Sequence, residues 1–239
     1  MQFPAESIIY SLISGLTAWF VLVPLIESIP SKLEKRWLTE FHQYAEIHRL
    51  DVSRITEESI PKSFRLRDKS IVCGSAIAAS LLVFAVRGTD LATMMLMIYV
   101  HGLLLLAAIN WRTSLLPDIA VLPLMWIGLL FAAYQGQAEE MIYGAAIGFL
   151  VPWALCWILK LTTDREALGY GDMKAFAMAG AWLGSSVLPY LFITFMAAVL
   201  VISVCLKNSN NRPSDEFPAG HVPSGVAHLI ASVLCILGS

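Results

Sequence analysis

The chain has 239 residues, of which 57% are hydrophobic and only 14% are charged, and its mean hydropathy is +0.69. An ordinary soluble domain is excluded, because its surface needs more polar side chains than this composition supplies. The formal net charge of −2 creates no basic field, which argues against nucleic acid as a partner. The composition predicts an all-α, polytopic membrane protein surrounded by membrane lipid.

Apolar segments predict about eight transmembrane helices, because most of them are long enough to cross a hydrocarbon core about 30 Å thick. In chain order these segments lie at about 7–29, 70–87, 90–109, 115–134, 141–161, 172–185, 186–206 and 222–238. The sixth segment is short and rich in small residues, which favour close approach of a neighbouring helix. The first segment is long enough to span the membrane and is expected to be a retained anchor.

The distribution of Lys and Arg predicts the orientation. If the N-terminus is outside, all 16 basic residues except Arg87 fall on one face, which is therefore expected to be cytoplasmic. Many of them lie in the loop 30–69, which also carries acidic residues and is expected to form an amphipathic subdomain against the membrane. We therefore divide the chain into 1–69, the first span with this cytoplasmic subdomain, and 70–239, a membrane-embedded core.

The cysteines and histidines indicate neither zinc nor a disulfide framework. The four cysteines lie in or beside apolar segments, and none forms a C-x-x-C pair. His101 and His228 lie in apolar segments without metal-ligand spacing, so each is expected to be a satisfied interior histidine or an interface residue. No metal site is predicted.

The stretch "LGYGDMK", residues 168–174, places the carboxylate of Asp172 at the start of the sixth apolar segment. A charged group at the edge of lipid is costly and usually functional. The flanking Gly169 and Gly171 let the backbone bend and leave room for a substrate chain, and a helix N-terminus favours an ionised acid. An N-terminal helix cap is the alternative role, and the two roles are compatible.

The motif "GYGDMK" resembles the G-x-G-D signature of intramembrane aspartyl proteases, and in particular that of type IV prepilin peptidases. Upstream, "INWRTSLLPDIAVLPLMWIGLL" at 109–130 is similar to the segment of that family that reads Ile-Asp, a polar turn and Leu-Leu-Pro-Asp. Residues 24–37 and 222–231 give looser matches near the two ends.

The resemblance implies an activity and a place for it. Such an enzyme cleaves the basic leader from type IV prepilins or pseudopilins at the cytoplasmic face of the bacterial inner membrane. It also methylates the new N-terminus with S-adenosylmethionine, which is expected here as a cofactor by resemblance only. The cytoplasmic loop of the family commonly carries two C-x-x-C pairs that bind zinc, and this chain has neither pair.

The family uses two aspartates, of which one maps to Asp172 and the other to Asn110. Aspartyl hydrolysis needs one carboxylate to deprotonate water and a protonated one to polarise the scissile carbonyl, whereas an amide cannot exchange the proton. This chain is therefore expected to bind prepilin but to cleave it very poorly. The remaining motif or substrate-binding positions are Gly169, Tyr170, Gly171, Lys174, Pro117 and Asp118.

Three explanations compete for Asn110. The chain is an engineered Asp-to-Asn variant, a natural pseudoprotease, or an enzyme in which Asp118 acts as the second acid. The first is favoured because the surrounding segment is intact and Asn is the closest isostere. Asp118 is less suitable, since it would lie about 12 Å from Asn110 along a straight helix and fits a cap or turn after Pro117.

The role of Lys174 and the function of the chain have alternative interpretations. Lys174 either neutralises a substrate acid or lipid phosphate, or is simply a basic residue at a cytoplasmic helix end. A catalytically dead scaffold that binds pilin is one alternative function. A small transporter is another, with an intramembrane ion site at Asp118 and a helix break near Gly169.

Overall fold

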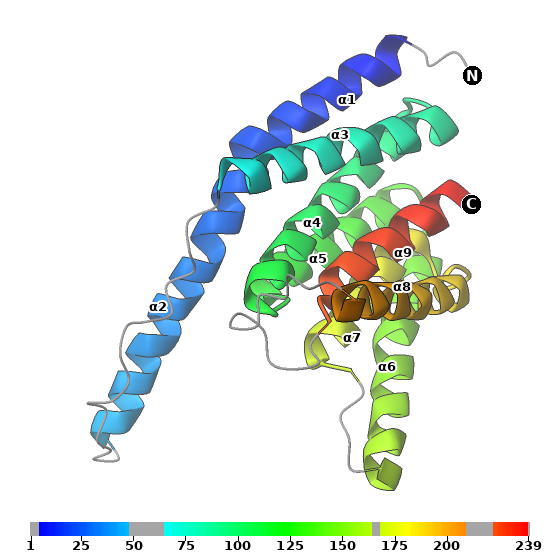
Figure 1. Cartoon of the computed structure of the whole chain (residues 1–239). Coiled ribbons are helices and arrows are strands. Elements are labelled where there is room, and N and C mark those ends of the chain that lie inside the picture. The colour runs from blue at the N-terminus through cyan, green and yellow to red at the C-terminus, as the bar shows by residue number, and fades with distance from the viewer. Residues whose placement is uncertain (1–4, 48–64, 164–167, 209–221, 239) are drawn as a thin grey trace.

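The computed structural model describes residues 5–47, 65–163, 168–208 and 222–238, and this part of the chain is helical and contains no strand (Figure 1). The elements in chain order are α1 (Ala5–Thr17), the π-helical η1 (Ala18–Leu22), α2 (Val23–Ile47), α3 (Leu66–Arg87), α4 (Leu91–Thr113), α5 (Asp118–Tyr134), α6 (Ala138–Thr163), α7 (Tyr170–Leu183), α8 (Leu188–Asn208) and α9 (Ser224–Gly238). The expected all-α class is confirmed.

A helix covers each of the eight apolar segments expected from the sequence. Among the described residues, five helical stretches are long and apolar enough to cross a membrane: Ala5–Glu40, Leu66–Arg87, Leu91–Thr113, Ala138–Thr162 and Leu188–Leu206. Helices α5 and α9 are apolar but shorter. The protein is therefore a multi-pass helical membrane protein, and eight is an approximate count of its spans.

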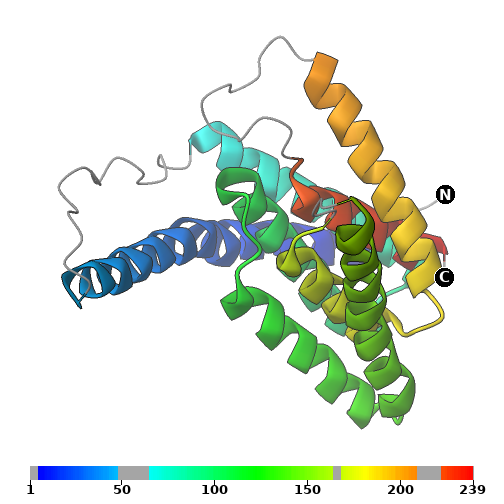
Figure 2. The same ribbon diagram turned by 90° about the horizontal axis from the view of Figure 1, so that it is seen from below.

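The first helix continues through Pro30 to Ile47, and Figures 1 and 2 both show α2 extending away from the other helices. Proline has no N–H to donate to the carbonyl four residues earlier, which here belongs to Ile26. Arg112 at the end of α4 supplies a donor instead, with its Nη1 3.2 Å from the Ile26 oxygen. The helix therefore continues beyond Pro30, and the hydrogen bond from Arg112 links it to α4. Residues 48–64 of the expected cytoplasmic subdomain lie outside the described residues.

Helix α7 is the most enclosed element, and every residue from Ala175 to Trp182 is buried. Its closest neighbour is α6, where Gly144 and Gly148 form a G-x-x-x-G pair, a pattern that lets two membrane helices approach closely. A Cβ atom on Gly144 would collide with the backbone of Gly180, and one on Gly180 would collide with that of Gly144. The two backbones are therefore in direct contact.

On its other side, α7 packs against α5. The indole Nε1 of Trp182 donates a 2.8 Å hydrogen bond to the carbonyl of Leu124, and its ring fills the space left by the absent side chain of Gly128. Its 14 residues give α7 a length of about 21 Å, which is shorter than the hydrocarbon core. Longer neighbours thus enclose a short helix whose first turn carries Asp172.

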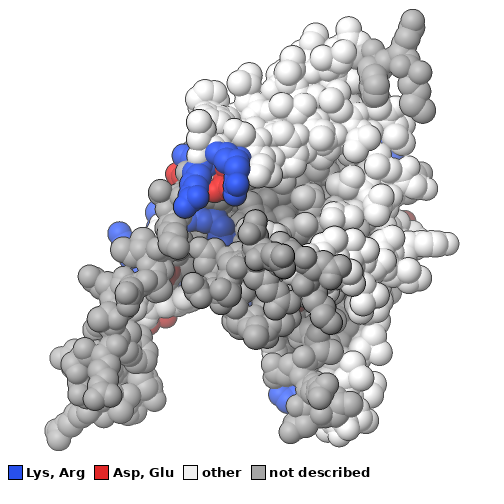
Figure 3. All heavy atoms as spheres, in the orientation of Figure 1, with Lys and Arg blue, Asp and Glu red and all other residues white. Residues whose placement is uncertain are grey.

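Charged side chains gather at one end of the molecule. Figure 3 shows a group of them at the N-terminal end of α3, while the surface over α1 and the rest of α3 is almost free of charge. Two ion pairs belong to this group, Lys69 with Glu27 at 3.0 Å and Arg67 with Asp68 at 3.8 Å. This distribution fits an apolar belt in lipid with a charged end in water.

The glycine contact between α6 and α7 predicts the effect of Gly180→Leu. The added side chain collides with the α6 backbone, so we expect a loss of at least about 2 kcal/mol in the free energy of unfolding in detergent micelles. Gly74→Leu is the matched control, because a Cβ there meets nothing within 4 Å, and its effect should stay below about 0.5 kcal/mol. Equal losses in the two variants would contradict the contact.

The bond from Arg112 to Ile26 predicts a dependence on Pro30. Arg112→Gln should cost about 1 to 3 kcal/mol of unfolding free energy, because it leaves a buried carbonyl without this donor. In a Pro30→Ala background the restored N–H of residue 30 reaches the same carbonyl, so part of that cost should disappear. A double-mutant cycle measures the difference, and strictly additive losses would argue against this pairing.

Candidate active site

Asn110 lies near the C-terminal end of α4 with only 1% of its surface exposed. Its Oδ1 accepts a 2.8 Å hydrogen bond from the backbone N–H of Gly225 in the first turn of α9. The helix ends shortly afterwards at Ser114, which adopts the left-handed conformation with φ 58° and donates its N–H to the Asn110 carbonyl at 2.8 Å. Both the side chain and the backbone of Asn110 are thus fixed.

The close contact between α9 and α4 at Asn110 requires a glycine at position 225. A Cβ atom at position 225 would lie 2.8 Å from the Cβ of Asn110 and 3.1 Å from the Cα of Ala107. Two helices that approach this closely leave no room for a side chain. The glycine of "VPSGVAHLIA" therefore places an N–H donor against position 110.

Asp172 lies in the first turn of α7, after Gly169 at the N-cap. Its side chain is 14% exposed, and the Ser224 side chain and the Gly169 backbone interact with the carboxylate. Gly169 has an ordinary extended conformation, with φ −77°. At Gly171 an added Cβ would lie 3.1 Å from the Cβ of Leu116, so this glycine lets α7 begin close to the loop between α4 and α5. Tyr170, between the two glycines, is exposed.

His228 is the neighbour of Asp172 that the sequence did not identify. Its Nε2 lies 3.4 Å from the Asp172 Oδ1, and its side chain is 2% exposed. Its ring packs against Phe176 and Phe195, with centroid distances of 4.7 and 4.4 Å. Of the two roles expected for His228, a satisfied interior histidine or an interface residue, the first holds only for its interior position, because neither ring nitrogen makes a hydrogen bond with the described residues. The sequence offered one indication: His228 lies one helical turn after Ser224, so the two residues share a face of α9.

Asp118 and Lys174 form an ion pair at the starts of α5 and α7. The Lys174 Nζ lies 2.7 Å from each oxygen of the Asp118 carboxylate. Pro117 is the N-cap of α5, and Asp118 follows it as the first residue of the helix. Because the chain turns at Ser114, the segment is not the straight helix assumed from the sequence. The pair gives Lys174 a protein partner and leaves Asp118 bonded to a cation.

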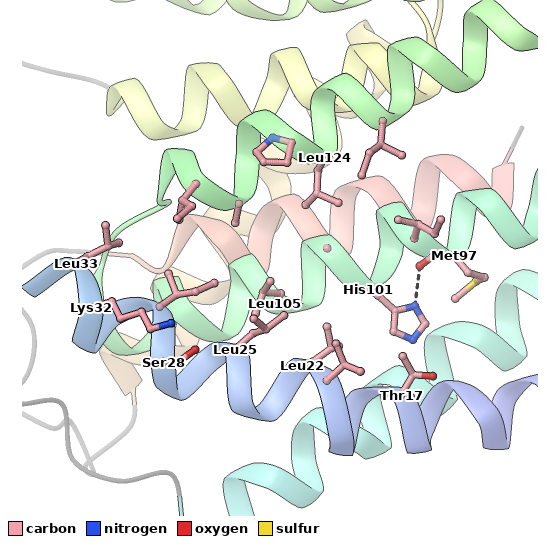
Figure 4. A pocket seen from close by; sticks show the side chains of 18 of the residues that line it. Thr17, Leu22, Leu25, Ser28, Lys32, Leu33, Met97, His101, Leu105 and Leu124 are labelled. Carbon is pink, nitrogen blue, oxygen red and sulfur yellow. Dashed lines mark hydrogen bonds between the residues drawn. The ribbon is translucent and has the colours of Figure 1, made fainter.

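A hollow of about 790 Å³ lies between α1–α2, α4 and α5 (Figure 4). Its lining from α4 includes Ile98, His101 and Leu105, whereas Tyr99 and Asn110 face α9 through bonds to Ser232 and Gly225. The hollow therefore lies on a different side of α4 from Asn110. It is lined mainly by apolar side chains, and neither Asn110 nor Asp172 is among its lining residues.

The hollow differs in chemistry from a site for the methyl donor implied by the resemblance. S-adenosylmethionine carries a sulfonium cation and an amino acid group, which need polar and acidic partners when buried. The hollow is lined mainly by apolar side chains, with a few polar ones and the basic Lys32 and Arg36, and its lining gives the sulfonium no acidic partner, so it does not fit this molecule. Within the described residues, no group of three His, Cys, Asp or Glu side chains is placed to hold a metal ion.

Residues 96–206 match the type IV leader peptidase family. The chain is 41% identical to a prepilin leader peptidase/N-methyltransferase of Escherichia coli K12 over 126 residues, which cover 52% of this chain and 54% of that protein. A protein of the same name from Pseudomonas putida is 29% identical over 252 residues, covering 91% of this chain and 87% of the relative. The resemblance read from the motifs is confirmed.

The extent of these matches varies. A further relative of that name, from Dichelobacter nodosus, is 35% identical over 172 residues, which cover 64% of this chain and 59% of the relative. The chain thus spans about half the length of several relatives it matches, including the Escherichia coli protein. No solved structure matches it.

The Asp118–Lys174 pair predicts a modest coupling energy. Both side chains are partly exposed, so a double-mutant cycle with Asp118→Asn and Lys174→Gln should give no more than about 1 kcal/mol in the free energy of unfolding. The more exposed Arg36–Glu40 pair is the matched control and should give less. Additive effects at positions 118 and 174 would contradict the pairing.

Proposed function

We propose that the protein acts on type IV prepilins or pseudopilins as a leader peptidase, because residues 96–206 match the type IV leader peptidase family. Cleavage takes place where the basic leader meets the membrane. One observation carries the proposal: the first turn of α9 touches both motif positions, with Gly225 bonded to Asn110 and Ser224 interacting with Asp172. Two positions that are 62 residues apart in the sequence therefore share one neighbouring turn.

In the active form, position 110 carries an aspartate. Asp172 removes a proton from water, and the protonated carboxyl at position 110 polarises the scissile carbonyl. The N–H of Gly225 needs an oxygen acceptor, which a carboxylate and an amide supply equally well. Asn110 therefore keeps the geometry but cannot exchange the proton. The present chain is a form that binds prepilin and cleaves it poorly, or a scaffold that only binds pilin.

The catalytic end of the bundle faces the cytoplasm in the bacterial inner membrane. Basic residues at the corresponding ends of α3, α4, α6 and α7 support this orientation, namely Lys69, Arg112, Lys160 and Lys174. Arg87 marks the opposite end, where its Nε donates to the carbonyl of Ile236. Residues 70–239 are the peptidase core, and residues 1–69 receive the leader from the cytoplasm.

The chain also methylates the new N-terminal amine of the pilin. Support for this second activity comes from the names of the relatives, which include N-methyltransferase and imply S-adenosylmethionine as the methyl donor. Because the described hollow does not fit that molecule, none of its residues is assigned a step in methyl transfer. We assign this activity to residues 1–69. Zinc is not expected there, because the chain lacks C-x-x-C pairs.

Reverting position 110 tests the peptidase proposal. Asn110→Asp should speed prepilin cleavage in membranes at least about 100-fold, because it restores the missing proton donor, and the conversion of precursor to mature pilin is followed on gels. On this background Asp172→Asn should abolish cleavage.

Two results would count against the proposal. A revertant that is stably folded yet leaves type IV prepilins and pseudopilins uncut would refute the peptidase function. Cleavage that survives the loss of Asp172 would refute the assignment of the two acids while leaving the function in place.

A further inference from the structure

The His228 imidazole is enclosed among the described residues and has no polar contact there other than Asp172, whose carboxylate also interacts with Ser224 and the Gly169 backbone. The Asp172 Oδ1 and both nitrogens of His228 make no hydrogen bond with any other described residue. Phe176 and Phe195 pack against the imidazole, and His228 is 2% exposed, so water has little access to it. Buried polar groups that lack partners are costly, and at 3.4 Å the His228 Nε2 and the Asp172 Oδ1 are placed to relieve that cost in each other.

In the reaction proposed below, such a pair takes up one proton and later releases it. If Asp172 and His228 share one proton, the pair is neutral overall, either as carboxylic acid and imidazole or as carboxylate and imidazolium. A shared proton is also the property that two facing carboxylates supply in aspartyl hydrolysis. Asn110 cannot contribute to it, because an amide does not titrate.

We propose that His228 is the positioning residue of Asp172 in this chain, and that it orients the carboxylate and stores the proton that Asn110 cannot hold. The inference rests on the proposed peptidase function. His228 is too buried to contact water itself, so it acts only through Asp172. Asp172 is the more exposed member of the pair and is the one that meets water. Residual cleavage by the Asn110 form then depends on His228.

The proton transfers balance. Before the attack the pair is a carboxylate beside a neutral imidazole. Asp172 accepts a proton from water as the water oxygen bonds to the scissile carbonyl carbon, and that proton moves to the His228 Nε2, which leaves a carboxylate beside an imidazolium. When the C–N bond breaks, the proton returns through Asp172 to the departing amine. Asn110 is not required to gain or lose a proton in any step.

The test is a double-mutant cycle on the full chain, with steady-state cleavage of a full-length type IV prepilin in detergent–lipid micelles. His228→Gln keeps a hydrogen-bond donor toward Asp172 but cannot store a proton. In the Asn110 chain it should lower kcat at least about tenfold with KM unchanged. In the Asn110→Asp background, where the second carboxyl is present, the loss should be less than about threefold. His228→Leu also removes the donor that orients the carboxylate, so in the Asn110 chain it should lower kcat at least as much as His228→Gln.

His101→Gln is the matched control, since His101 already has its own partners, Ser14 at 2.7 Å and the Met97 carbonyl at 2.6 Å, and should leave kcat unchanged in both backgrounds. Unfolding curves show whether each variant is folded. The inference is overturned if His228→Gln lowers kcat equally in both backgrounds, if it changes only KM, or if the Asn110 chain cleaves no faster than its Asp172→Asn variant. In each case, cleavage by the Asn110→Asp revertant would leave the proposed function intact.

Discussion

Helices α6 and α7 touch backbone to backbone because Gly144 and Gly180 carry no side chains at their crossing. This contact encloses α7, a helix too short to cross the membrane alone, among longer neighbours. In lipid the hydrophobic effect gives no drive for helices to associate, so such close packing has a large part in holding them together. The position of Asp172, in the first turn of α7, depends on it.

The first turn of α9 has a comparable role for the other half of the site. Gly225 bonds Asn110, Ser224 interacts with Asp172, and His228 packs beside that carboxylate. A glycine, a hydroxyl and an imidazole within five residues thus reach two helices that are distant in sequence. The geometry is compatible with either an aspartate or an asparagine at position 110, because the Gly225 N–H only needs an acceptor.

The first helix illustrates how a membrane protein accommodates a proline. The sequence suggested that the span would end near residue 29, before Pro30, and that a loop would follow. The helix instead runs on to Ile47, and Arg112 donates a hydrogen bond to the carbonyl that proline leaves without its usual partner. Neighbouring helices are known to satisfy such carbonyls, so a proline alone does not mark the end of a transmembrane helix.

The sequence by itself determined the helical class, the apolar segments and the motif positions Asp172 and Asn110, because helix length, hydropathy and short motifs are local properties of the chain. Tertiary structure decided which side chains meet. The partners Asp172 and His228 are 56 residues apart, and Asp118 and Lys174 are also 56 residues apart, so no helical periodicity relates them. Only the packing of α5, α7 and α9 brings these groups together, because contacts between helices depend on how whole helix faces fit.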